Sequence, residues 1–431
     1  MNAARQRFLP ALGGLLVLTT GGGLGLLLTG HDQGFIALAL VQGAIYAGLA
    51  AIVLRHGAAR NFLIACLACA ALMRVIVLVA PPILSDDVYR YVWDGRVQAN
   101  GINPYRYVPA DPALSALRDD AIYPHINRKD YATTIYPPGA QTIYLLVTRL
   151  GESVSVMKLA MVGFEIAALL LLAAMLGRAG LPRERVLLYA LHPLPVWEFA
   201  GSGHVDAAMI AAMVLALWLH QRGGRAATGA ALAVAALIKL FPLAIGAALW
   251  RRWDWRLPLA FVALVALAYL PYIDVGARVL GFLPTYVQEE GLQSGAAFYP
   301  LWLLRAIVPV PTAVYLVAAA SILLGLAAWV ALRGEAGAAW RHALLLAAAF
   351  LFLTSPHFPW YLAWLLPLAC LAPWWPALYL VSASVVLYLP VPFALTGSIV
   401  YGGFAVLAVI DRLRRTAPAL QEKPDVIGLT R

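Results

Sequence analysis

The densest run of chemically capable side chains is Ser-Asp-Asp-Val-Tyr-Arg-Tyr-Val-Trp-Asp-Gly-Arg at residues 85–96. It places adjacent carboxylates, Asp86 and Asp87, just after an apolar stretch, with Arg90 one helical turn beyond Asp86. Arg90 could hold one carboxylate ionised while apolar surroundings raise the pKa of the other, which suits general-base catalysis. The alternative is a solvated helix start capped by Ser85, whose surface salt bridge contributes at most ~1 kcal/mol.

Two further polar clusters interrupt apolar segments. Residues 198–206, Glu-Phe-Ala-Gly-Ser-Gly-His-Val-Asp, combine a tight turn with His204 and Asp206 at the start of a predicted helix. A helix N-terminus beside a titratable imidazole could face an anionic group, or the cluster could be only the capped tip of a hairpin. Lys239 lies among apolar residues, where an unpaired lysine costs about 2.5–3.5 kcal/mol on insertion scales. It could therefore hold a lipid phosphate, or extend its ammonium to the head groups.

A fourth cluster contains His357 between two prolines, followed by Trp360 and Tyr361. A histidine at membrane depth is usually a packing residue, but prolines that break a helix expose backbone groups that must line a cavity. His357 is therefore a candidate for the same pocket. The elements that would bring these four clusters together follow from the composition of the chain.

The chain of 431 residues is 62% apolar and only 12% charged, with a mean hydropathy of +0.80. Soluble domains carry about 25% charged residues, so a soluble enzyme, a secreted disulfide scaffold and a disordered chain are all excluded. The net charge of +10 comes from arginines in short links between apolar runs, which indicates cytoplasmic loops rather than nucleic-acid binding. The fold class is an all-α, polytopic integral membrane protein.

Apolar runs and their basic flanks predict about 12–14 transmembrane helices with both ends in the cytoplasm. The predicted helices span 8–30, 34–54, 61–82, 154–176, 184–198, 206–220, 227–239, 241–250, 257–272, 311–332, 343–355, 360–372, 375–390 and 397–410.

Between the third and fourth of these helices lies a long, acidic outer loop at 83–136. Residues 137–150 are too short to cross and predict an amphipathic helix on the outer surface, and a second one is expected near 302–308. The proline breaks fall at the outer ends of their helices, which predicts one pocket on the extracytoplasmic face. Residues 411–431 predict a cytoplasmic tail.

Residues 85–96, with Asn-Gly-Ile-Asn-Pro-Tyr at 100–105 and Ile-Tyr-Pro-Pro at 135–138, resemble bacterial GT-C membrane glycosyltransferases. The nearest group is the polyprenyl-phosphate-mannose-dependent mannosyltransferases. Supporting matches lie at 201–206, 238–242 and 355–362. The resemblance covers 61–410 as a GT-C-like catalytic domain, and residues 1–60 form two additional transmembrane helices. Val205-Asp206 stands where many relatives have Asn-Asp, and His192 where Asn is frequent.

The resemblance implies inverting transfer of a hexose, with mannose as the expected sugar, from a polyprenyl-phosphate donor to a lipid or glycan acceptor. It places an acid of the first outer loop, Asp86 or Asp87, as the base, with Asp86 the first choice, and leaves the acceptor and the linkage open. Arg90, Lys239 and His357 would bind the donor phosphate. The expected pocket residues are Tyr89, Asp94, Arg96, Tyr136, His204, Asp206, Trp360 and Tyr361.

The implied location is the bacterial inner membrane, with a multi-pass chain whose active site faces the periplasm or exterior. Its partners would be the lipid-linked donor, the acceptor and membrane lipids, without nucleic acid. No metal ligands are predicted, no cofactor is certain, and the sequence leaves a need for Mg²⁺ or Mn²⁺ open. The alternative function is a transporter or flippase for a lipid or small solute, because broken helices and the membrane-depth charges of Arg74, Glu165 and Lys239 also suit transport.

Overall fold

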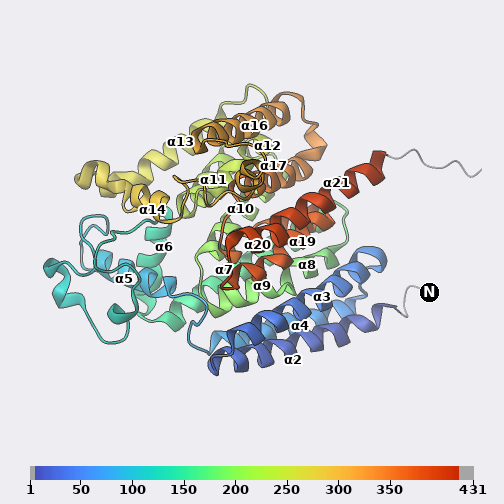
Figure 1. Cartoon of the computed structure of the whole chain (residues 1–431), viewed down its shortest axis with the longest axis horizontal. Coiled ribbons are helices and arrows are strands. Elements are labelled where there is room, and N and C mark those ends of the chain that lie inside the picture. Colours follow the sequence, from blue (N-terminus) through green and yellow to red (C-terminus); the bar gives the residue numbers. More distant parts are fainter. Residues whose placement is uncertain (1–4, 417–431) are drawn as a thin grey trace, which may run out of the picture.

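The computed structural model describes residues 5–416, and within this part of the chain every regular element is a helix (Figure 1). The prediction of an all-α, polytopic membrane protein is confirmed. Seven described segments are long and apolar enough to cross a membrane. They are α2 (Phe8–Leu28), α3 (Asp32–His56), α4 (Arg60–Leu78), α7 (Val154–Arg178), Arg256–Glu289 beginning with α13 (Arg256–Tyr269), α16 (Thr312–Arg333) and Phe393–Thr416 ending with α21 (Gly403–Thr416).

The other predicted crossings are short or bent. Pro193–Gly201 and α10 (Asp206–Gln221) together would make an eighth span, but they are bent by 119°. The shorter helices are α11 (Arg225–Ile238), α15 (Tyr299–Arg305), η7 (Ala336–Ala338), α17 (Ala339–Thr354), η8 and α18 (Pro359–Leu371), and α19 and η9 (Trp375–Tyr388). The span Arg256–Glu289 also contains η6 (Leu270–Leu280) and α14 (Leu283–Glu289), and the span Phe393–Thr416 contains α20 (Phe393–Gly397) and η10 (Ser398–Gly402).

Proline breaks two segments that the sequence predicts as single helices. Predicted helix 184–198 is instead a buried chain of short turns that ends in a π-helix, because Pro193 and Pro195 cannot continue an α-helix. Predicted helix 241–250 is too short to cross. The observed elements are η3 (Arg183–Val186), α8 (Leu187–Ala190), α9 (Pro193–Pro195) and η4 (Val196–Gly201), and then η5 (Phe241–Ile245) and α12 (Gly246–Leu249).

The first three helices lie side by side and are joined to the rest of the bundle by polar contacts as well as apolar ones (Figure 1). Buried Gln42 of α3 donates to the Thr20 hydroxyl of α2 at 3.1 Å and accepts from the indole of Trp197 at 3.0 Å. Gly23 of α2 lies against the same indole ring, where a Cβ atom would come within 2.9 Å. The N-terminal helices therefore pack directly on the broken segment.

An ion pair at membrane depth joins α4 to α7. Arg74 donates to both carboxylate oxygens of Glu165, at 2.8 and 3.1 Å, and to the carbonyl of Ala190 at 2.8 Å. Both side chains are buried. Because the guanidinium and the carboxylate satisfy each other, these charges have a structural role in the bundle and lend no support to a transport pathway.

The outer loop 83–136 contains a well-packed helix, α5 (Asp87–Ala99), which lies against α6 (Pro138–Leu150). Tyr91 and Tyr144 stack at 4.6 Å, and a Cβ atom on Gly95 would collide with Thr148 and the Tyr144 backbone. The surface helix predicted at 137–150 thus exists, but one of its faces is buried against α5. Two short 3₁₀ turns, η1 (Pro112–Leu117) and η2 (Tyr123–His125), lie in the loop that connects α5 to α6.

Arg96 joins three parts of the outer region. Its guanidinium binds Asp119 at 2.7 Å, Glu152 at 2.8 Å and the carbonyl of Leu117 at 3.0 Å. Partial burial would raise the pKa of Asp119, but hydrogen bonds from Arg96 and from two backbone amides outweigh it and lower this pKa to about 2. The ionised carboxylate therefore contributes stability above its ordinary pKa, and this contribution disappears as the pH falls through about 2.

Arg96→Ala should loosen this loop without disturbing the membrane bundle. Loss of charge-assisted hydrogen bonds, each worth about 1.5–3 kcal/mol, should raise the rate of tryptic cleavage at Arg118 about tenfold at neutral pH. Arg149→Ala is a suitable control, because exposed Arg149 makes a single bond, to the Ala99 carbonyl. Equal cleavage rates in Arg96→Ala and the wild type would contradict the bracing role.

Candidate functional site

The site begins at the N-terminus of α5, where Asp86 is the N-cap residue and Asp87 the first helical residue. Ser85, the predicted cap, instead lies one residue earlier and accepts the Asp87 amide at 3.3 Å. The amide of Asn127 bridges the two carboxylates, at 2.8 Å from Asp86 and 2.9 Å from Asp87. Asn127 was not predicted, because nothing in the sequence distinguishes it from other polar loop residues.

The two aspartates differ in their surroundings. Asp86 is exposed, whereas the Asp87 side chain is only 25% exposed. Burial raises the pKa of Asp87, the hydrogen bond from Asn127 opposes this rise, the charge of Asp86 adds to it and the charge of Lys239 opposes it. Asp87 is therefore the carboxyl whose proton affinity is adjusted toward general-base work.

His204 reaches Asp87 from the bend between the π-helix η4 and α10. Gly203 allows this bend because its φ of +78° is left-handed and a Cβ there would lie 2.9 Å from Val88. The buried His204 ring stacks on Trp360 at 3.9 Å, with Nδ1 3.8 Å from Oδ2 of Asp87. His204 and Trp360, which belong to two different predicted clusters, thus form one group with Asp87 of the acidic cluster.

Lys239 enters from the C-terminal end of α11. Its ammonium lies 2.8 Å from both carboxylate oxygens of Asp206 and 3.8 Å from the centre of the Tyr361 ring. Asp206 is fully buried and the Lys239 side chain is 17% exposed. The structure therefore brings together six of the predicted residues, which are Asp87, His204, Asp206, Lys239, Trp360 and Tyr361.

Arg90 has a different partner from the one that its spacing suggests. It binds Asp94 at 2.8 Å and the carbonyl of Ala132 at 3.1 Å, and both charged side chains are buried. Asp94 also accepts from Gln141 of α6 at 2.9 Å. Asp86 lies ahead of the helix proper, so Arg90 pairs one turn forward, on the face that packs against α6. Arg90 and Asp94, like Arg96, hold the outer region together.

Among the other predicted residues, Asp86 adjoins the cluster through Asn127, whereas His357, Tyr89 and Tyr136 have partners of their own. His357 is 3.2 Å from the carbonyl of Ala297, and its ring packs on Phe393. Tyr89 stacks on His125 at 4.8 Å, and Tyr136 packs edge-on against Tyr91 and Tyr144. None of the hydrogen bonds and ring contacts found within residues 5–416 joins His357 or Tyr89 to Lys239.

A family model described as alpha-(1->6)-mannopyranosyltransferase, N-terminal domain, matches residues 12–253. This range is more than half of the chain and contains Asp87, His204, Asp206 and Lys239. The chain belongs to this family. No curated protein and no solved structure gives a match. The family match begins at residue 12, so it includes the two N-terminal helices that the sequence sets apart from 61–410.

Membership of the mannopyranosyltransferase family establishes a membrane glycosyltransferase that transfers mannose. Within the described residues, no group of three or more His, Cys, Asp or Glu side chains is arranged to hold a metal ion. The two adjacent carboxylates, Asp86 and Asp87, share the amide of Asn127 instead.

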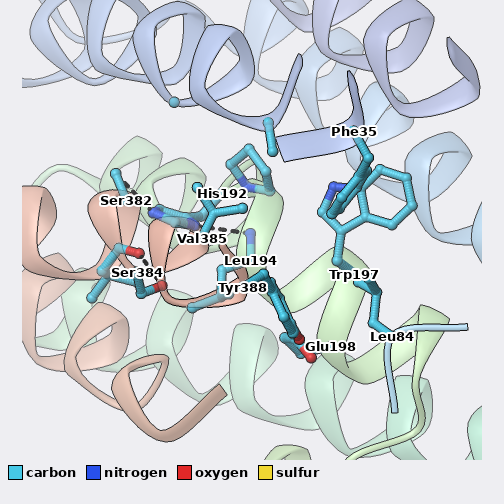
Figure 2. Close-up of a pocket in the computed structure, with 14 residues that line it drawn as sticks. Phe35, Leu84, His192, Leu194, Trp197, Glu198, Ser382, Ser384, Val385 and Tyr388 are labelled. Atoms are coloured by element: carbon cyan, nitrogen blue, oxygen red, sulfur yellow. Dashed lines mark hydrogen bonds between the residues drawn. The ribbon is translucent and has the colours of Figure 1, made fainter. Parts of the chain in front are cut away.

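The structure gives surroundings to Glu198 of the π-helix, which opens the second polar cluster of the sequence but has no role predicted there. It is buried and accepts a hydrogen bond from the Tyr388 hydroxyl at 2.7 Å. Both side chains line the small pocket that Figure 2 shows, below His192, whose ring lies 3.1 Å from the Ser382 hydroxyl. A charged residue inside an apolar segment is the signal that marks Glu198, but its partner lies 190 residues away.

Proposed function

We propose that this family member transfers mannose from a polyprenyl-phosphate donor to a hydroxyl of a lipid or glycan acceptor, with inversion, on the extracytoplasmic face of the bacterial inner membrane. One observation supports this most directly. A half-buried carboxylate, Asp87, lies within electrostatic reach of a lysine that keeps one N–H free, in a chain whose family transfers mannose. The broken helices around the site and the long apolar spans suit a substrate that stays in the membrane.

Asp87 rather than Asp86 is the base in this proposal. Its carboxylate is partly desolvated, which raises its proton affinity, whereas Asp86 is exposed. Asp87 takes the proton of the acceptor hydroxyl as that oxygen attacks the anomeric carbon. The bond from the anomeric carbon to the phosphate oxygen breaks, and the phosphate leaves with the electron pair.

Lys239 stabilises the leaving phosphate. Its ammonium has three N–H donors, and two of them are directed at Asp206, so one remains for a phosphate oxygen. The aromatic face of Tyr361 covers the ammonium and excludes water from that side. Arg90 and His357 are left out of this role because other groups already occupy them.

The family description suggests the linkage. An α-(1→6) product made with inversion requires a donor in which the phosphate is β-linked, and an acceptor that offers a primary hydroxyl. Octyl α-mannopyranoside supplies such a hydroxyl on a membrane-soluble molecule and is therefore a suitable acceptor probe.

The test uses the full-length protein in liposomes, with radiolabelled β-mannosyl polyprenyl phosphate and octyl α-mannopyranoside. We expect a labelled disaccharide with an α linkage to C6, and no product from GDP-mannose. Transfer from GDP-mannose alone would overturn the proposed donor. Ion-gradient-driven solute uptake without sugar transfer would favour a transporter.

A further inference from the structure

Several buried polar atoms directly behind Asp87 have no part in the scheme above. Across residues 5–416, both ring nitrogens of His204 and Oε2 of Glu198 are buried and make no hydrogen bond within the usual limits. A buried polar atom without a partner destabilises the fold, so such atoms are uncommon and each needs an explanation, of which a catalytic role is one. Here three of them lie next to one another.

These atoms form a line that starts at the proposed base. On one side of His204, Nδ1 faces Oδ2 of Asp87 at 3.8 Å. On the other side, Nε2 faces Oε2 of Glu198 at 3.5 Å. An imidazole therefore lies between two carboxylates, each within about one ångström of hydrogen-bonding distance, and such contacts often tighten when a substrate binds.

The surrounding contacts hold His204 and Glu198 in place. The indole of Trp360 stacks on the His204 ring and fixes its plane, and the backbone amide of His204 donates to the Glu198 carbonyl at 3.0 Å. Tyr388 donates to the other oxygen of Glu198. That bond stabilises the ionised carboxylate and leaves Oε2 to face Nε2 of His204. Glu198 belongs to the π-helical turn and lines the pocket that Figure 2 shows.

We propose that Asp87, His204 and Glu198 form a buried proton relay in which His204 and Glu198 position the base and take over its proton. This inference rests on the proposed function, because it requires Asp87 to receive the acceptor proton. The relay starts from the state in which Asp87 and Glu198 are ionised and His204 is neutral, with its proton on Nε2. Burial opposes the ionised form of Glu198, and the hydrogen bond from Tyr388 favours it.

The relay moves two protons. After the sugar has been transferred, the proton on Asp87 passes to Nδ1 of His204 while the Nε2 proton passes to Oε2 of Glu198. Asp87 is then again a carboxylate, Glu198 holds the proton, and neutral His204 carries its proton on Nδ1. When the products have left, the two protons move back and Asp87 releases one to water, so that His204 again carries its proton on Nε2. The arrangement follows the general logic by which a buried carboxylate orients an imidazole and fixes its tautomer.

The first test compares Glu198→Gln, Glu198→Asp and the wild type in the liposome assay. We expect kcat of Glu198→Gln to fall about tenfold to a hundredfold with the donor KM unchanged, because Glu198 touches neither substrate. Glu198→Asp keeps the acid and should recover part of this loss. Wild-type kcat in Glu198→Gln would overturn the relay.

Tyr388→Phe gives a second measurement with a matched control. It removes the hydrogen bond that holds Glu198, and should lower kcat a few-fold, without a change in KM. Tyr315→Phe removes a comparable phenol bond, to the Leu353 carbonyl, far from the relay and should leave kcat unchanged. Equal effects of the two variants would indicate that Tyr388 acts only through packing.

A double-variant cycle separates the relay from the proposed function. If Glu198 acts through Asp87, Glu198→Gln should lower kcat in the wild-type background and should have no further effect on Asp87→Asn. An equal loss in both backgrounds would show that Glu198 is structural. Full activity of Asp87→Asn alone would instead refute Asp87 as the base, whatever Glu198 does.

Discussion

Asp87→Asn should lower the turnover of sugar transfer by about 10²–10⁴-fold, the contribution expected of a positioned general base. The amide keeps the shape of the side chain and can still contact Asn127, but it cannot accept the acceptor proton. The measurement is the initial rate with radiolabelled donor in liposomes. Asp86→Asn should lose far less, because Asp86 is exposed and lies farther from His204 and Lys239.

Asp87→Asn should be at least as stable as the wild type at pH 7. Because the pKa of Asp87 is raised in the folded protein, its ionised form disfavours the fold, and the wild type gains stability only as the pH falls through that raised pKa. Thermal unfolding at pH 7 checks this sign. A lower melting temperature for Asp87→Asn would contradict this sign, and one near the assay temperature would attribute the lost activity to unfolding. The wild-type rate should fall in acid at a pH above the ordinary aspartate pKa.

Lys239→Met should both destabilise the protein and stop transfer. It leaves the fully buried Asp206 without a counter-ion, and breaking a buried pair in this way typically costs about 3–5 kcal/mol. It also removes the donor proposed for the leaving phosphate, and the loss of one such donor lowers kcat by about 10²–10³-fold. Thermal unfolding and initial rates measure the two effects separately.

The double variant Lys239→Met/Asp206→Asn distinguishes these roles. Replacing both charges of a buried pair is often nearly neutral, so the melting temperature should return toward the wild-type value. Transfer should stay low, since the double variant still lacks the Lys239 ammonium that is proposed to bind the leaving phosphate. Recovery of wild-type turnover in the double variant would mean that the Lys239–Asp206 pair only supports the fold.

Much of the fold could be predicted because long apolar runs with basic flanks mark helices directly. The ends of α3, α10 and α16 agree with the predicted ranges 34–54, 206–220 and 311–332 to within about two residues. The number of membrane-spanning helices was harder to predict, because the predicted helices 184–198 and 241–250 contain prolines and form short turns instead. The predicted tail beginning at 411 continues α21 as far as Thr416, and residues 417–431 lie outside the described chain.

The candidate site was predictable in the residues that stand out beside or within apolar segments, but not in the partners that these residues contact. A lysine at membrane depth needs a partner, which marked Lys239, and paired acids after an apolar stretch marked Asp87. Spacing reports which residues share a helix face, but it does not report which face is buried, so Arg90 was expected near a phosphate although it pairs with Asp94. The contact of Glu198 with Tyr388 spans 190 residues, and no local pattern encodes it.

The π-helical turn before the bend makes this enzyme sensitive to the length of one short segment. Its wider ring, seen in the bond from the Ser202 amide to the Trp197 carbonyl, accommodates one more residue than an α-helical turn. Deleting a single residue there would let the turn relax to α geometry and would rotate everything downstream by roughly 100°. Homologues should therefore tolerate exchanges of side chains in this turn far better than a gap of one position.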